Sequence, residues 1–275
     1  MARAIEQIER DIATISVSVG AIASELGSAY TNYLTALGQA TRAQLILASY
    51  QICTQKYPKQ FLSLSVSQRQ QLQQAIRKLS KNAAQQLINQ LKSKVNVEEA
   101  LDSPEENQES KTTENYELQI TNYDPTCFSN PIELLVWQQT QESSIAYTLK
   151  TLSLETNILL QQAGILPQKL PSPLLEAAAT APESTHAAEA PNLMNLVIET
   201  ENSSDEEESS MTQLVAIQLR LSEIEFADAN LRAARNQIRS LETRINLLVR
   251  EYQKKQRERI IAEAEAAWRS GWFDE

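Results

Sequence analysis

The chain has 275 residues, of which 42% are hydrophobic, and a formal net charge of −10. Five glycines are few for a fold rich in tight turns, and two cysteines, Cys53 and Cys127, offer neither a disulfide framework nor a metal cluster. The first residues include Arg3, Glu6 and Glu9, where a signal peptide would need an apolar run. We therefore expect a cytoplasmic protein.

The charge is distributed unevenly along the chain. Residues 58–97 carry +7, whereas residues 98–125 and 167–210 carry −8 each. The acidic stretches also contain prolines and scattered Ser, Thr and Asn, a composition typical of disordered linkers. We therefore expect two acidic linkers, at residues 96–129 and 167–210, between helical segments.

Apolar residues recur at alternating steps of three and four from residue 5 to residue 50, which predicts one face of a long helix. We call this face the seam. The helix is expected to run from Arg3 to Tyr57, where Pro58 ends it, and to be roughly 80 Å long. β-Branched residues at both seam positions of the first half favour three or four packed helices. The expected interaction seam here is Ile5, Ile8, Ile12, Ile15, Val19, Ile22 and Leu26, and the pattern continues through Ala29, Tyr33, Ala36, Ala40, Ala43, Leu47 and Tyr50.

The back of this helix is unusual because Glu25 is its only charged residue between Ile12 and Thr41. Ser, Thr and Gly fill the rest of that face. Such a face is covered in a bundle or in an oligomer, but a bulky apolar stripe backed by small polar residues is also typical of helices that lie in a membrane interface. A transmembrane span is less favoured, because Glu25 would lie inside it.

A second, basic amphipathic helix is predicted from Ser67 to Lys94, with Gln70 completing a capping box. Together with the first helix it makes an N-terminal segment, residues 1–95. No acidic residue occurs between residues 58 and 97. The basic side chains of this helix therefore either interact with the acidic linkers of the same chain or contact an anionic surface. The candidate contacts are Arg69, Arg77, Lys78 and Lys81.

A middle helix is predicted within residues 130–166. Asn130 is expected to cap its start, followed by Pro131 and Glu133, and Gly164 to end it. Its apolar residues cover more than one stripe, which predicts a broadly buried helix.

A last helix, about Thr212 to Ser270, is predicted within a C-terminal segment of residues 211–275. The apolar island at residues 193–198 is read as a sticky piece of linker or as a docking peptide. The helix repeats the seam pattern, and its expected seam residues are Ile224, Leu231, Ile238, Leu241, Ile245 and Leu248. The aromatic tail, Trp268, Trp272 and Phe273, is expected either to plug the bundle or to anchor a partner.

No catalytic, cofactor-binding or metal-binding pattern is evident. The single histidine, His186, lies in the second linker, and no phosphate-binding glycine motif or Glu-x-x-His pair occurs. We therefore predict a protein that is not an enzyme and carries no cofactor or metal.

These features predict an all-α protein, an elongated helical bundle or coiled coil in which the long N- and C-terminal helices pack antiparallel. Two shorter middle helices and two disordered acidic linkers complete it. The leading functional hypothesis is a scaffold or adaptor acting through coiled-coil packing, with an unidentified protein partner or a second copy of itself. A peripheral protein on the cytoplasmic face of a membrane, using residues 12–37 and 59–94, is the alternative. Nucleic-acid binding through the basic helix and Arg232, Arg235, Arg239 and Arg244 ranks last, because the acidic linkers would compete with a polyanion.

Overall fold

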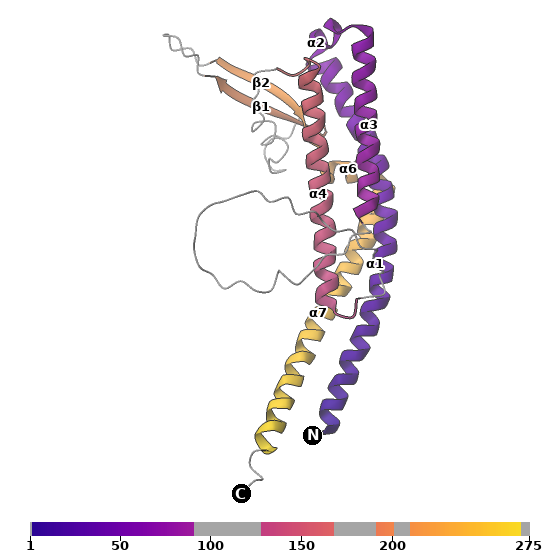
Figure 1. Ribbon diagram of the computed structural model, residues 1–275, viewed down its shortest axis with the longest axis vertical. Coiled ribbons are helices and arrows are strands. Elements are labelled where there is room, and N and C mark those ends of the chain that lie inside the picture. Colours follow the sequence, from indigo (N-terminus) through magenta and orange to yellow (C-terminus); the bar gives the residue numbers. More distant parts are fainter. Residues whose placement is uncertain (1, 91–127, 168–190, 201–209, 271–275) are drawn as a thin grey trace. The chain divides into compact units, whose positions relative to one another are not determined.

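The protein is all-α, as predicted, with one β-hairpin among the described residues. Figure 1 shows the elements of this computed structural model. It describes residues 2–90, 128–167, 191–200 and 210–270.

The chain forms two compact units. The first, here the terminal unit, contains Met1–Thr31, Asn89–Glu142 and Ala234–Glu275. The second, here the hairpin unit, contains Asn32–Ile88 and Ser143–Ala233. Four of the described helices contribute residues to both units.

The N-terminal helix ends where the sequence predicts. Helix α1 (Ala2–Gln51) continues into a π-helical turn, η1 (Ile52–Lys56), and Pro58 then begins the short helix α2 (Pro58–Ser63). The backbone N–H of Tyr57 donates to the Ile52 carbonyl over 2.9 Å, which closes the π turn. Proline cannot donate to the preceding helix, so the chain turns here.

The seam of α1 is correct as far as Tyr33, leaves the core gradually at Ala36 and Ala40, and is wrong beyond them. Ile15, Val19, Ile22 and Leu26 are buried, but Ala43, Leu47 and Tyr50 are exposed. A strict 3.5-residue repeat drifts by about 20° per heptad on a straight helix, so later seam positions rotate away from the core. The residues buried instead are Tyr30, Leu34, Leu37, Thr41, Leu45, Ala48 and Ile52.

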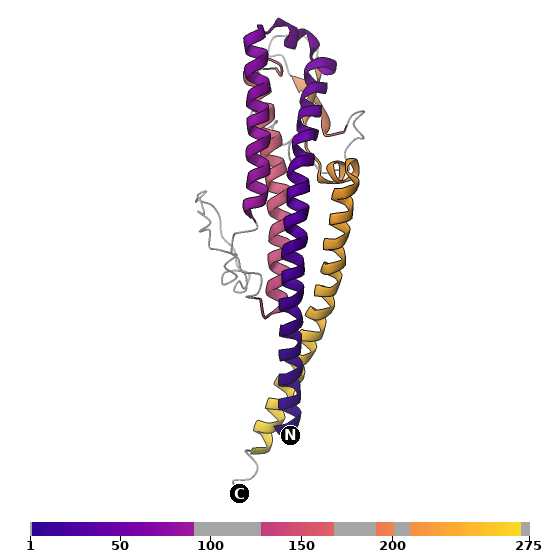
Figure 2. The same cartoon turned by 90° about the vertical axis from the view of Figure 1, so that its right-hand side faces the viewer.

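In the hairpin unit, helix α3 (Val66–Gln90) lies beside the later part of α1 in both views (Figures 1 and 2). A Cβ at Gly38 would lie 3.0 Å from that of Ala84, so only a glycine fits this crossing without displacement. The capping box is present but lies two residues earlier than predicted. It pairs Ser65 with Gln68, whose backbone N–H groups each bond the other's side chain.

Helix α4 (Pro131–Gln162) has the predicted ends. The Asn130 side chain accepts a hydrogen bond from the Ile132 N–H at 2.9 Å. At the other end Gly164 adopts a φ of 76°, and the N–H of Ile165 bonds the Leu160 carbonyl over 2.9 Å. This is a Schellman ending, for which glycine is the preferred residue.

The region between residues 193 and 217 contradicts the sequence prediction. The apolar island is strand β1 (Leu193–Thr200), and the expected start of the last helix is strand β2 (Ser210–Ile217). The two strands pair antiparallel, with Leu193 opposite Ile217. Helix α6 (Leu221–Ala227) and helix α7 (Ala229–Ser270) follow. The prediction failed because Leu214 and Ile217 also fit the three-four spacing of a helix, whereas side chains distant in sequence bind β2.

Those side chains come from α4 and from the end of η1. The Asn157 amide bonds both backbone groups of Ile217, at 2.9 Å to the N–H and 2.8 Å to the carbonyl, as a neighbouring strand would. The Tyr57 hydroxyl accepts from the Val215 N–H at 2.9 Å. Ser153 accepts from the Leu219 N–H at 2.9 Å. These contacts fix the hairpin against the helices of its own unit.

Candidate functional site

In the terminal unit, α1 and α7 pack antiparallel, as predicted. Two ion pairs show the antiparallel direction. Asp11 of α1 contacts Lys255 of α7 at 3.0 Å, whereas Glu25, later in α1, contacts Arg244, which comes earlier in α7, at 2.6 Å. Of the predicted seam residues on α7, Ile238, Leu241 and Ile245 are buried here and Leu248 is half-buried. The predicted seam residues Ile5, Ile8 and Ile12 of α1 are half-buried. The remaining two, Ile224 and Leu231, are buried in the hairpin unit.

The ion pairs lie along the edge of this seam. The hydrogen bond from Lys255 lowers the pKa of Asp11, with a smaller contribution from Gln7. The hydrogen bond to Asp11, and a second to Glu258, raise the pKa of Lys255. Both shifts favour the charged forms, so the pair stays ionised at neutral pH.

A buried polar cluster joins all three long helices of this unit. Glu142 on α4 accepts from the Tyr30 hydroxyl at 2.5 Å and from Arg235 of α7 at 2.6 Å. The Tyr30 ring also packs edge-on against Trp137, with 5.5 Å between centroids. Burial, and then the charge of Glu142, raise the pKa of Tyr30 above its usual value, so its hydroxyl stays protonated and serves as a donor. We read this cluster as structural.

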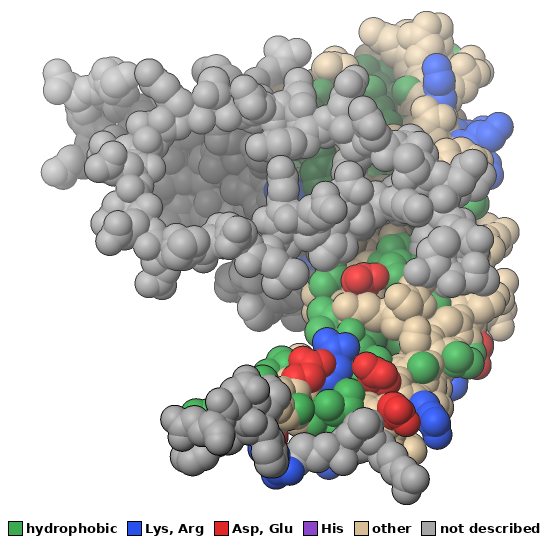
Figure 3. All heavy atoms as spheres, turned by 60° about the horizontal axis from the view of Figure 1, so that its bottom comes forward, with side chains coloured by type: hydrophobic (Ala, Val, Ile, Leu, Met, Phe, Trp, Pro, Cys, Tyr) green, Lys and Arg blue, Asp and Glu red, His purple; other side chains and the backbone are tan. Residues whose placement is uncertain are grey.

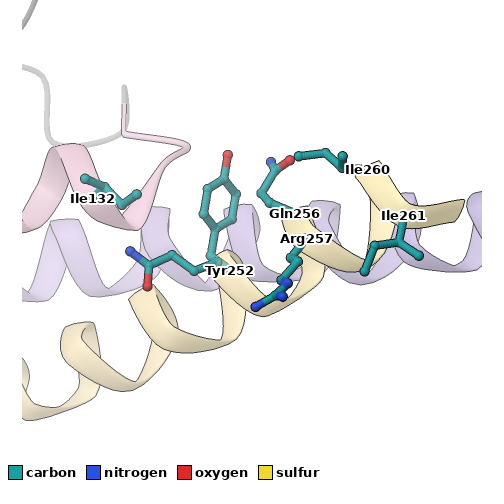
Figure 4. Close-up of a pocket in the computed structure, with 7 residues that line it drawn as sticks. Ile132, Tyr252, Gln256, Arg257, Ile260 and Ile261 are labelled. Atoms are coloured by element: carbon teal, nitrogen blue, oxygen red, sulfur yellow. The ribbon is translucent and has the colours of Figure 1, made fainter. Parts of the chain in front are cut away.

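The seam opens into a groove where α4 begins. The groove has a volume of about 490 Å³ and is lined by Ile132 of α4 and by α7 residues from Tyr252 to Ile261. Figure 4 shows Tyr252, Gln256 and Ile260 projecting from successive turns on one side of α7, with Ile132 beside Tyr252. Among the described residues no third helix accompanies α1 and α7 beyond Ile132.

Large apolar side chains are exposed at this groove. Ile260 is 60% and Ile261 50% exposed, in a part of α7 where the seam positions are polar. Figure 3 views the end at which α1 begins and α7 ends, and shows apolar side chains interspersed with acidic and basic ones. Ile260 and Ile261 do not belong to the predicted seam, and the signal for them in the sequence is an Ile-Ile pair within a highly charged stretch.

The predicted anionic-surface contacts separate into two kinds. Arg69 lies over the Phe61 ring, at 5.4 Å from its centroid, and donates to the Phe61 and Leu62 carbonyls at 3.1 and 2.6 Å. Arg69 therefore provides hydrogen-bond donors for two backbone carbonyl groups at the end of α2. Arg77, Lys78 and Lys81 are exposed on α3.

The aromatic tail is described only in part. Trp268, on the last turns of α7, is 71% exposed and so does not plug the bundle. Trp272 and Phe273 lie outside the described residues, as do Cys127 and His186.

Two observations on the described residues bear on metal binding and nucleophilic chemistry. No group of three His, Cys, Asp or Glu side chains within them is placed to hold a metal ion. Cys53 is buried, and burial raises the pKa of its thiol to about 11, which disfavours the nucleophilic thiolate.

One described helix, Ile5–Lys56, is long and apolar enough to cross a membrane by length and composition alone. Glu25, inside this helix, disfavours a transmembrane span. The bulky stripe that lipid would contact, Ile15, Val19, Ile22 and Leu26, is buried within the protein.

Fold and groove together define a class of protein, an all-α assembly of long antiparallel helices with an exposed apolar groove. The sequence matches no protein-family model, and no significant match was found to a curated protein or a solved structure.

Proposed function

We propose that this protein is a non-enzymatic scaffold or adaptor that receives a helix of a partner protein in the groove between Ile132 and Ile261. The observation that supports this most is the exposure of Ile260 and Ile261, which lie beyond the part of α7 that α4 covers. Burying such side chains is worth about 1.5 to 3 kcal/mol each, which favours a partner that covers them.

The seam chemistry adds a second argument. β-Branched residues at both core positions favour assemblies of three or four helices. Between Ile132 and the end of the terminal unit at which α1 begins, α1 and α7 are the only described helices. An incoming amphipathic helix would supply the third member, which is the helix-in-groove mode of recognition.

Site-specific photo-crosslinking tests this proposal. A photoreactive phenylalanine analogue at Ile260 should crosslink a helical protein or a second copy of the chain, whereas the same analogue at Asn246, an exposed position outside the groove, should not. Equal crosslinking at the two positions, or none at either, would contradict a specific groove.

Reconstitution with the crosslinked protein gives the quantitative check. Ile260→Glu with Ile261→Glu should weaken binding at least about tenfold, because two carboxylates would have to be buried. Asn246→Glu with Arg250→Glu, on exposed positions of the same helix, is the matched control and should bind as the unaltered protein does. Circular dichroism should show the same helical content in all three.

Peripheral membrane binding is the second candidate, supported by the apolar length of the N-terminal helix. Because its stripe is buried, lipid binding would require α1 to separate from α7, or would use the exposed Val17 and the basic residues of α3. Flotation on anionic vesicles that is lost in Val17→Glu and in the triple change of Arg77, Lys78 and Lys81 to Gln would support it. Flotation that is unchanged in both variants would contradict membrane binding through these residues.

Nucleic-acid binding remains the last candidate. Two of the four arginines proposed for it, Arg235 and Arg244, are paired with Glu142 and Glu25. Nucleic-acid binding with an affinity that falls steeply as the salt concentration rises would support this candidate.

A further inference from the structure

The hairpin unit contains a cavity that the scaffold role does not use. Its volume is about 320 Å³, and it lies among the end of α1, η1, α2 and α3. An apolar cavity of about 150 Å³ is large enough for benzene, so this one has room for a longer molecule. Its apolar lining is Ile46, Cys53, Phe61, Leu72 and Ile76.

A buried hydroxyl lines this cavity without a partner. Ser49 is only 6% exposed, and its Oγ makes no hydrogen bond to any described residue. A buried polar group left unsatisfied costs about 1 to 3 kcal/mol, which a ligand oxygen would recover once the Ser49 side chain rotates its shielded hydroxyl towards the cavity.

The backbone at the cavity is also irregular. Cys53 and Thr54 belong to the π turn η1, and both line the cavity. This π turn ends α1, a position at which such turns are ordinary. Here it widens the helix at the cavity wall.

Charge selects among small apolar ligands. Arg77 lines the cavity and is exposed, and the chain has no Asp or Glu between residues 26 and 97. An anionic group at this position therefore meets a guanidinium and no acidic residue of the same stretch. A neutral molecule of the same shape would lack this attraction.

We propose that this cavity binds one molecule of a small carboxylate amphiphile, of the size of a medium-chain fatty acid. Its chain packs against Ile46, Leu72 and Ile76. Its carboxylate accepts from the Ser49 hydroxyl and faces Arg77. The site is non-covalent, since the buried Cys53 is held as the thiol.

Titration calorimetry with monomeric decanoate and decanol tests the ligand class. Decanoate should bind at one site per chain and more tightly than decanol. Arg77→Gln should weaken decanoate roughly three- to five-fold and leave decanol unchanged, whereas Lys78→Gln, at the neighbouring exposed position outside the cavity, should change neither. Ser49→Ala should weaken decanoate about tenfold. Decanol binding as tightly as decanoate, or no saturable binding of either, would overturn the proposal.

Alkylation of Cys53 locates the ligand. In a Cys127→Ser background, decanoate at ten times its Kd should slow alkylation of Cys53 by a small maleimide about tenfold, by mass action. Ile76→Trp, which fills the cavity, should abolish both binding and ligand protection. If this variant fails to fold, the comparison of Arg77→Gln with Lys78→Gln still decides.

A vesicle experiment separates a free carboxylate from a lipid headgroup. The proposal requires that decanoate protects Cys53 when no bilayer is present. Protection by anionic vesicles alone, with no effect of monomeric decanoate, would contradict the cavity site and favour membrane binding. None of these readouts depends on Ile260, so their failure is distinguishable from failure of the scaffold role.

Discussion

In the terminal unit, an apolar seam joins α1 to α7 and ion pairs lie along its edge, whereas in the hairpin unit neutral side chains bond directly to the backbone of β2. Glu25 and Arg244, at the edge of the seam, are each half-exposed. Asn157, which bonds Ile217, is completely buried. Exposed ion pairs contribute little, while a buried backbone group that loses its partner is costly. Loss of a polar group at the edge of the seam and loss of one that bonds β2 should therefore have very different effects on stability.

The largest effect is expected from Asn157→Leu. The change leaves the N–H and the carbonyl of Ile217 buried without their side-chain partner, at about 1 to 3 kcal/mol each, so we expect a loss of about 4 kcal/mol. Urea unfolding measures the loss, and faster hydrogen exchange at Val215 and Ile217 would place it in the hairpin unit. Glu155→Leu, at an exposed position on the same helix, is the control. A loss below about 1 kcal/mol would mean that water satisfies these groups.

Ile238→Ala should have the next largest effect. Ile238 is fully buried on α7, and truncating such a residue costs about 3 kcal/mol through lost burial and the cavity left behind. Ile260→Ala, on the same helix but 60% exposed, should change stability by less than about 0.5 kcal/mol. Equal losses in the two variants would show that Ile260 is buried in solution, for example by a second copy of the chain.

The smallest effect is expected from Asp11→Asn, and its signature is pH dependence. The pKa of Asp11 is lowered on folding, so its contribution is present above the unfolded value of about 3.9 and is lost as the pH falls through the folded value. The pKa of Lys255 is raised, so its contribution is present below about 10.4 and is lost as the pH rises through the folded value.

The small difference in urea midpoint between Asp11→Asn and the unaltered protein should therefore be constant from about pH 5 to 9 and vanish at both extremes. High salt should also reduce it. Glu9→Gln, an exposed carboxylate on the same helix, is the matched control and should show no such window. A difference that persists at pH 2 would mean that Asp11 acts through something other than its charge.

Much of the helical fold was predictable because it depends on local signals. Pro58 and Gly164 mark helix ends through their backbone and Asn130 does so through its side chain, and the structure confirms all three. The first-half seam was also predictable, since bulky β-branched residues leave little choice of buried face. Its second half was not, because small seam residues such as Ala36 and Ala40 do not oppose a gradual rotation of the helix.

The hairpin was not predictable from local pattern. Leu214 and Ile217 fit both a strand and a helix, and the choice depends on Asn157 and Tyr57, which are distant in sequence. Asn192 is a second case. It adopts a φ of 60° and is fully buried, and its side chain accepts from the Arg220 N–H and donates to Gln44. Only the adjoining Pro191 hinted at a turn there.

The candidate sites show the same limit. Ile260 and Ile261 are visible in the sequence, but their exposure depends on where α4 begins. Ser49 and Arg77 are 28 positions apart, and only the corner through α2 brings them to one cavity.

The π turn has a further consequence, for insertions and deletions. It contains one residue more than regular α-helical winding requires, and the wider turn accommodates this residue, so the chain reaches Pro58 in nearly the rotational phase of an unbroken α-helix. Deleting one residue from Ile52–Lys56 would therefore restore regular winding and leave Tyr57 close to its present direction. Deleting one residue from helix α1 would instead turn Tyr57 by about 100° around the helix axis, and its hydroxyl would then point away from Val215. A single-codon deletion should thus be tolerated better in this turn than in α1, where it would uncouple the hairpin without removing any side chain that contacts it.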